Sequence, residues 1–337
     1  MRGSVISAFS EPEEFEVAMS GKGHIDLIFT GKGRFRAQST EVRLLHLRLA
    51  SVDERLPRIA FFRAPPETIL VALSNGQGTV PIWGGIRMQG GELITLGAGQ
   101  CAHMRTEGPC RWGAIWLPVR QLIHYGGALT GAATPPPPAL CHWQPPLRLG
   151  RQLHRLLWAA VRTTEARSLL IAGAAAAHGL EQQLIHLLVD CLSAKPIGMA
   201  APAMQRRIEM MTKFEVLIRS HREDKLSASF ISAALGVSAR RLREHCKDHL
   251  GMSPMSYVRL YRMQQAHRTL QHGDPKMVRV AEVAERFGFH NPGRFAGAYR
   301  KLYGNLPGET LRRGSRAGAP PIVLRNRTVV SNARAGN

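Results

Sequence analysis

Cysteine is scarce in this 337-residue sequence, and the few cysteines form no pairs by spacing. An odd count of five, with no two of them two residues apart, excludes a disulfide framework and a zinc-finger site. Apolar runs are short as well. The longest, residues 169–177, falls far below the ~20 residues of a membrane span, and no signal-peptide core follows residues 1–4. We therefore expect a cytoplasmic chain that contacts no membrane.

Motifs for catalysis and metal binding are also missing. Fourteen histidines include no His-x-His and no His-Glu-x-x-His pattern, so scattered core and surface histidines are expected instead of a metal centre. The sequence has no Gly-x-Ser-x-Gly motif, no recognisable carboxylate pair and no glycine-rich phosphate loop. It therefore predicts no metal, no cofactor and no enzyme.

Acidic residues are too few to balance the basic ones. Lys and Arg total 45 against 24 Asp and Glu, a formal net charge of +21. Residues 201–337 carry +15 of this excess, whereas residues 1–200 carry +6. Such a surplus indicates a polyanionic partner, namely nucleic acid, an anionic membrane surface or an acidic substrate. The partner should bind the C-terminal part of the chain.

Glycine and proline divide the chain into parts. Between residues 22 and 120, short apolar runs alternate with glycine turns, as in a barrel or a sandwich. We expect residues 1–140 to form a cupin-like β-barrel sensor domain, so the predicted fold class is α+β. Prolines at 135–138 and 145–146 end this part, because proline interrupts helices and central strands. Residues 147–195 are expected to form linker or dimerisation helices, and residues 202–313 a helical, basic domain. Residues 314–337 are expected to be a disordered basic tail.

Leucines within residues 149–192 recur at helical spacing and form two apolar stripes. One stripe contains Leu153 and Leu157, and the other contains Leu180, Leu184 and Leu188. The spacing leaves two alternatives open. Both stripes pack on the β-rich domain, or the helices pair in a homodimer.

A first helix-turn-helix unit is predicted in the basic region. A short helix over 230–235 is followed by a turn and by a second helix over 239–250. Gly236 suits the positive φ of the tight turn, and Ser238 can cap the helix that follows. Leu242 is expected to face inward.

A second unit repeats this pattern. A helix over 280–287 precedes a turn, Asn291 is the predicted N-cap, and Pro292 takes the first helical position. A helix over 254–270 joins the two units and is long enough to hold them about one DNA turn apart. Both units together resemble a bipartite DNA reader.

Residues 205–313 resemble the DNA-binding domain of AraC/XylS-family transcriptional regulators. Residues 293–295, 299–300 and 309–313 resemble the branch that includes the ethanolamine-operon regulator, and residues 22–120 are weakly similar to the sensor barrel of that branch. The resemblance implies a bacterial activator or repressor that binds double-stranded DNA as a homodimer. A small-molecule effector and RNA polymerase are further candidate partners. The matching residues include Gly236, Leu242, Pro254, Tyr257, Arg262, Ala266, Ala284, Gly288, Phe295, Tyr299, Gly304 and Pro307.

DNA-contacting residues are predicted on both second helices. A basic helix face is commonly just solvated, but one that follows a capped turn in a family match favours DNA, and Arg reads guanine through its two-donor fork. Glu244 accepts from cytosine or pairs with a basic neighbour on its own helix. Residues 296–298 are small, so the later cations of the second helix are expected to contact phosphates. The predicted contacts are Arg240, Arg241, Arg243, Glu244, Lys247, Asn291, Arg294, Arg300 and Lys301.

Two functions remain open for the β-rich domain. It binds an effector that changes how two subunits present their readers to DNA, or it only dimerises and DNA binding is independent of ligand. A pocket would favour the first function, and an interior filled by apolar side chains would favour the second. Candidate interior residues are Trp83, Arg87, His103, Trp112 and Trp116. An enzyme tethered to DNA would require a catalytic cluster that the spacing does not show.

Overall fold

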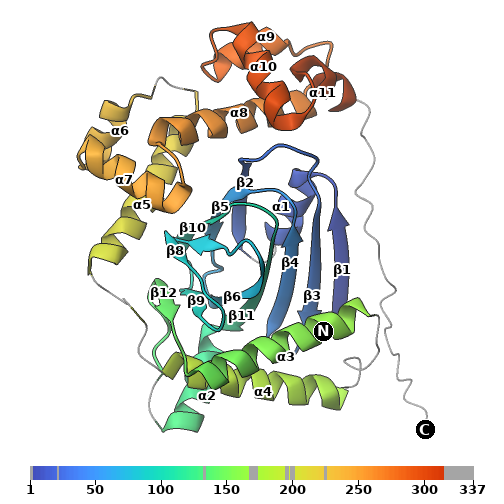
Figure 1. The fold of residues 1–337 in the computed structure, drawn as a ribbon, viewed down its shortest axis with the longest axis vertical. Coiled ribbons are helices and arrows are strands. Elements are labelled where there is room, and N and C mark those ends of the chain that lie inside the picture. The colour runs from blue at the N-terminus through green and yellow to red at the C-terminus, as the bar shows by residue number, and fades with distance from the viewer. Residues whose placement is uncertain are drawn as a thin grey trace.

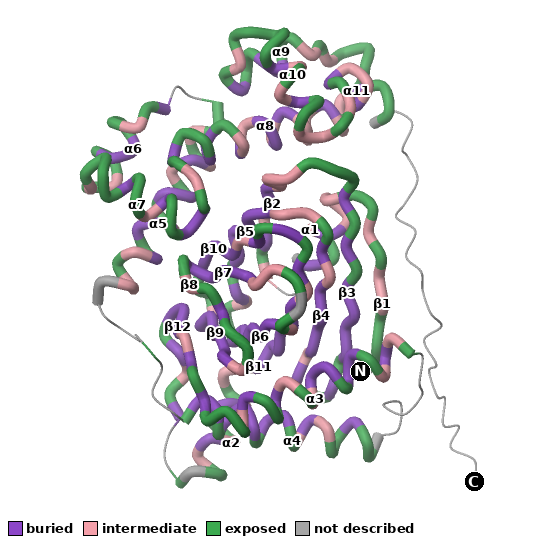
Figure 2. Tube along the Cα trace, in the orientation of Figure 1, coloured by how far each residue is buried: buried purple, intermediate pink, exposed green. Residues whose placement is uncertain are grey.

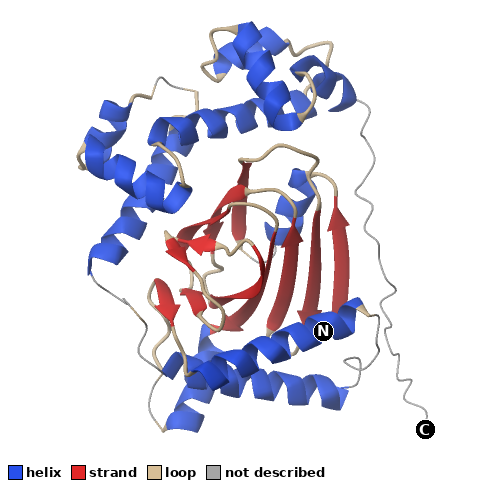
Figure 3. Ribbon diagram, in the orientation of Figure 1, coloured by secondary structure: helices blue, strands red, loops and turns tan. Residues whose placement is uncertain are grey.

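The computed structural model describes residues 3–20, 23–131, 134–166, 174–193, 197, 202–223 and 226–314. Its sheet-rich part, residues 3–143, holds two separate sheets, and helices lie on both sides of them (Figure 1, Figure 3). The larger sheet has the order β1 (Gly3–Phe9), β3 (Ala37–Arg43), β4 (Arg48–Glu54), β11 (Cys110–Pro118), β6 (Thr68–Gly78), β9 (Leu93–Leu96) and β12 (Leu140–Trp143). The smaller has the order β2 (His24–Phe29), β5 (Arg58–Arg63), β10 (Cys101–Thr106), β7 (Ile82–Trp83) and β8 (Ile86–Arg87).

Both sheets are open, so the predicted closed barrel is wrong and the sandwich is the better description. Strand β6 gives the physical reason. Leu70 and Ala72 face the smaller sheet, whereas Ile69, Val71 and Leu73 face the helices on the other side. A strand that is apolar on both faces must be packed against other elements on both faces. A layered stack of sheets and helices provides this packing, whereas the outer wall of a barrel would face water.

Three helices cover the outer face of the larger sheet: α2 (Val119–Thr130), α3 (Leu147–Glu165) and α4 (Ala174–Ser193). Leu157 of α3 and Leu184 of α4 are fully buried in this layer. Close approach of α3 requires Gly113 on β11, because a Cβ there would lie 2.6 Å from Leu157 Cδ2. Of the two alternatives for the leucine stripes, the structure shows packing on the sheet within one chain.

The outer face of the smaller sheet is covered by the helical part, residues 202–314. Ile28 and Ile59 of the sheet share a core with Met211 and Phe214. That core spans the first helices, and a second core lies further along the chain (Figure 2). The helices are α5 (Pro202–Ser220), α6 (Ala228–Leu235), α7 (Ala239–Leu250), α8 (Pro254–His272), α9 (Val280–Arg286), α10 (Pro292–Tyr303) and α11 (Pro307–Gly314).

A buried polar cluster joins the sheet-rich part to the helical part. Glu215 of α5 lies at its centre, with Oε2 3.0 Å from His103 Nε2 on β10. Tyr257 of α8 donates its hydroxyl to the same oxygen at 2.7 Å. Arg219 donates to Glu215 Oε1 at 2.7 Å and pairs with Asp26 of β2 at 2.5 Å. The helical part is therefore docked on the sheet by directional contacts as well as by apolar packing.

A second set of contacts between the helical part and the sheet-rich part lies nearer the C-terminal end of α8. Arg268 of α8 pairs with Glu16 of α1 (Pro12–Ser20), and Gln264 donates to the Leu27 carbonyl. Neither α1 nor strand β1, which pairs with β3, was predicted from the sequence.

The described residues show no disulfide bond, no metal-binding group and no membrane-spanning helix. All five cysteines are buried and free. Within the described ranges, no group of three or more His, Cys, Asp or Glu side chains could hold a metal ion. None of the helices described above is long and apolar enough to cross a membrane. The predicted tail lies outside the described residues, apart from Gly314 at the end of α11.

Candidate nucleic-acid interface

The first helix-turn-helix unit is formed by α6 and α7. Helix α6 starts two residues earlier than predicted, and its N-cap Ser227 accepts from Phe230 N–H at 3.1 Å. Gly236 has φ of 65°, and Ser238 accepts from Arg241 N–H at 3.2 Å. The predicted turn chemistry is therefore confirmed.

Helix α7 separates a buried face from a basic one. Leu242 and Cys246 are fully buried, whereas the five residues predicted to contact DNA are all exposed. Arg240 Nε lies 2.9 Å from Glu244 Oε1, so one of the open pairings of Glu244 exists in the chain without DNA. The exposed residues are Arg240, Arg241, Arg243, Glu244 and Lys247.

The second unit is formed by α9 and α10. Asn291 Oδ1 accepts from Arg294 N–H at 2.9 Å with Pro292 at the start of α10, as predicted. Phe295 is buried against α9 and α11. The side chain of Asn291 thus keeps its NH₂ group and a second lone pair of Oδ1 for another partner.

The exposed surface of α10 has small residues at its centre and cations towards its two ends. Arg294, Arg300 and Lys301 are exposed, and so is Gly297, whose missing Cβ would meet nothing within 4 Å. The middle of this helix therefore offers no long side chain to a ligand.

Sequence reasoning missed a basic groove of about 300 Å³ beside α10. Arg259 and Arg262 of α8 line it together with His290 and Arg294. Arg262 was noted only as a family-matching position, and Arg259 and His290 carried no signal. Their convergence depends on how α8 packs against the second unit, which helical spacing within α8 does not reveal.

The space between the two sheets is densely filled. Trp83 and Trp112 lie edge to face there with ring centroids 6.1 Å apart, and Trp112 donates to Glu54 at 2.8 Å. Arg58 pairs with the same carboxylate and is fully buried. Of the five candidate interior residues, the three tryptophans lie between the sheets, His103 faces Glu215 and Arg87 is exposed.

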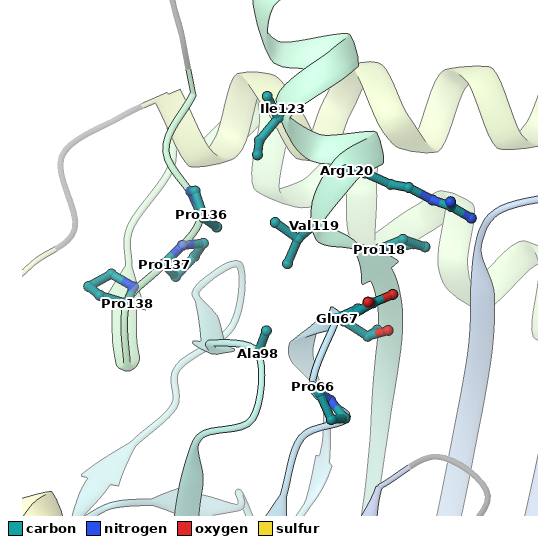
Figure 4. Close-up of a pocket in the computed structure, with 11 residues that line it drawn as sticks. Pro66, Glu67, Ala98, Pro118, Val119, Arg120, Ile123, Pro136, Pro137 and Pro138 are labelled. Carbon is teal, nitrogen blue, oxygen red and sulfur yellow. The ribbon is translucent and has the colours of Figure 1, made fainter.

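A larger cavity of about 910 Å³ lies at one end of the sandwich, beside α2 (Figure 4). Prolines 136–138 form one wall, and Val119 and Ile123 of α2 form another. Glu67 and Arg120 bring one charge of each sign to its lining. The cavity has room for a drug-sized molecule.

Comparison with known proteins gives the class. Residues 231–313 match a family model described as a helix-turn-helix domain. The chain is 37% identical over 95 residues to a probable thc operon regulatory protein of Rhodococcus erythropolis, covering 28% of this chain and 29% of that protein. It is 26% identical over 131 residues to XylDLEGF operon transcriptional activator 3 of Pseudomonas putida, and this match covers 39% of this chain and 38% of that protein. The chain thus spans about a third of the length of these curated relatives.

Among solved structures, a probable AraC family transcriptional regulator from Rhodopseudomonas palustris CGA009 is 30% identical, with a TM-score of 0.30. The match covers 32% of this chain and 97% of that one. The matched domain and the two capped units define a helix-turn-helix protein of the transcription-regulator class. By this domain, the chain belongs to the AraC/XylS family of transcriptional regulators.

Proposed function

We propose that the chain is a sequence-specific DNA-binding regulator that places α7 and α10 in successive major grooves of one duplex. The exposed basic face of α7 carries this proposal. Arg240 and Arg243 lie in its first half, on a helix whose opposite face is buried, and Arg can donate two hydrogen bonds to guanine.

The two helices read DNA unequally in this proposal. Helix α7 contacts base edges, whereas α10 presents small residues at its centre and cations near its ends. Arg300 and Lys301 then contact phosphates, which fix the register without specifying sequence. One half of the binding site should be sharply defined and the other degenerate, with centres about 10 base pairs apart.

Binding-site selection with the full chain tests this proposal. Arg243→Ala should cost about 1–3 kcal/mol and relax preference at one or two base pairs. Arg300→Ala should weaken binding to all sequences alike and lower the salt slope by about one. A suitable control is Arg155→Ala, which removes an exposed arginine from α3 on the opposite side of the sandwich. Two equally sharp half-sites would show that α10 reads bases.

Salt dependence tests DNA as the partner. About six to eight phosphate contacts for each chain predict a slope of log K against log salt of about −5 to −7. A flat dependence between low and physiological salt would exclude DNA.

Effector binding is the second part of the proposal. The packed space between the sheets disfavours a ligand there, so the cavity beside α2 is the better candidate site for a small molecule. Ile123→Trp should place a bulkier side chain in it, and a ligand that binds there and raises the melting temperature of the wild type should raise that of the variant less. If ligands stabilise both forms equally, this cavity is not the effector site. If no ligand stabilises the wild type, ligand-independent binding is favoured.

The expected setting follows from these assignments. We propose residues 3–143 as the effector or dimerisation domain and residues 202–313 as the DNA reader, in a cytoplasmic, nucleoid-associated homodimer that acts on RNA polymerase. The leucines of α4 are buried within one chain, so the dimer contact must involve other residues.

A further inference from the structure

The basic groove beside α10 has walls from two elements that are distant in sequence. Helix α8 supplies Arg259 and Arg262, and the second helix-turn-helix unit supplies His290 and Arg294. Met255, Val258, Phe287 and Phe289 add apolar surface. Among the described residues that line the groove, none is an Asp or a Glu. The groove therefore favours an anion over a neutral or cationic ligand.

The basic side chains of this groove are available to a ligand. Arg259, His290 and Arg294 are exposed. Within the described parts of the chain, the guanidinium groups of Arg259 and Arg294 form no ion pair. An arginine fork held near a second one binds phosphate oxygens with directional, charge-assisted hydrogen bonds. Phosphate is thus the anion that this lining fits best.

The backbone of the turn and of α10 supports the same assignment. Gly288 has φ of 80°, and a Cβ at this position would lie 3.0 Å from Arg262 Nη1, so the absence of a side chain lets this guanidinium lie across the turn. Asn291 and Arg294 of the first turn of α10 also line the groove. The N-terminal end of α10, which carries the positive end of the helix dipole, thus borders the groove that the arginines line.

We propose that this groove binds a backbone phosphodiester of the DNA that lies between the two major grooves. This proposal rests on the proposed function. Helix α8 joins the two units. In the proposed arrangement, a duplex that receives both α7 and α10 passes α8 with the backbone that lies between its two major grooves. The groove fixes the register there without reading bases.

Fluorescence anisotropy of the full chain at several salt concentrations tests this assignment. Arg259→Gln should lower the slope of log K against log salt by about 0.9, equivalent to about an eightfold difference between 0.1 M and 1 M salt. The loss should be the same on selected and random duplexes, and Arg259→Lys should restore most of the slope. The control Arg155→Gln, on α3, should leave the slope unchanged.

Three outcomes would overturn the assignment. An unchanged slope in Arg259→Gln, with wild-type binding intact, removes the groove from the DNA path. A loss confined to the selected duplex makes Arg259 a base reader. The third outcome is that inorganic phosphate stabilises the wild type but not Arg259→Gln, while the slope of log K for DNA against log salt is unchanged. The ligand of the groove is then a free phosphate. Failure of the wild type to bind any duplex would instead refute the proposed function itself.

Discussion

Replacing Glu215 should destabilise the docking of the helical part on the sheet-rich part. Its carboxylate is fully buried and holds His103, Arg219 and Tyr257 at 2.7–3.0 Å. Burial alone would raise the pKa of Glu215, but hydrogen bonding and charge from His103, followed by Arg219 and Tyr257, hold that pKa below its usual value. The carboxylate is therefore ionised at neutral pH, and its partners depend on it.

The magnitude follows from what the substitution leaves behind. Glu215→Ala strands the imidazole of His103 and the hydroxyl of Tyr257 without this acceptor, and leaves Arg219 with Asp26. Removing one partner from a buried ion pair costs about 3–5 kcal/mol. Glu215→Gln keeps an acceptor oxygen for Tyr257 and should cost about 1.5–3 kcal/mol. The expected order of stability is wild type, then Gln, then Ala.

Thermal and urea unfolding of the full chain would measure this order. At roughly 2 °C for each kcal/mol in a chain of this size, Glu215→Ala should melt about 6–10 °C below the wild type. Glu209→Ala is the matched control, because Glu209 lies on the same helix, is exposed and bonds only Gln205 at 3.0 Å among the described residues. If Glu215→Ala and Glu209→Ala unfold alike, the buried cluster does not hold the two parts together.

Three further predictions concern the core, pH and helix α10. Leu184→Ala should lower the free energy of unfolding in denaturant by about 2–5 kcal/mol. It should leave the sedimentation coefficient of the native protein unchanged, because Leu184 packs inside one chain. Conversion of a dimer to a folded monomer would contradict this expectation. Burial, with the charges of Arg268 and His272, lowers the pKa of His267 to about 4, so stability should fall by up to about 3 kcal/mol as pH drops from 6.5 to 4. His267→Phe should make that part of the pH profile flatter in unfolding titrations, and a profile as steep as in the wild type would refute the assignment. Gly297→Ala should raise stability by up to ~1 kcal/mol in thermal melts, since the exposed position has open space for a methyl group; a lower melting temperature would contradict it.

The helix-turn-helix units could be predicted because their signals are local. The hydroxyl of Ser238 caps a backbone N–H three residues away, and Gly236 meets a backbone requirement at its own position. Leu242 and Phe295 follow from a period of 3.6 residues. Such features require no knowledge of distant parts of the chain, and the predicted helix starts were correct to within two residues.

Strand pairing shows where local signals end. Strand β6 lies within residues 22–120, where the sequence predicts short strands, but the sequence does not state which strands flank it or whether the sheet closes. Strand β1 carries a half-exposed, serine-containing sequence whose pairing with β3 is set by tertiary contacts. The choice between barrel and sandwich was therefore made by nonlocal hydrogen bonding.

The sequence by itself determined the family, the basic character of the reader, its capped turns and the helical period of the leucine stripes. Only the tertiary structure decided what covers those stripes, which face of the smaller sheet receives the helical part, and that Arg259 and His290 converge beside α10. The physical reason is the range of the interactions. Caps, turns and periods act within a few residues, whereas a buried carboxylate such as Glu215 joins side chains that are more than 100 residues apart in the chain.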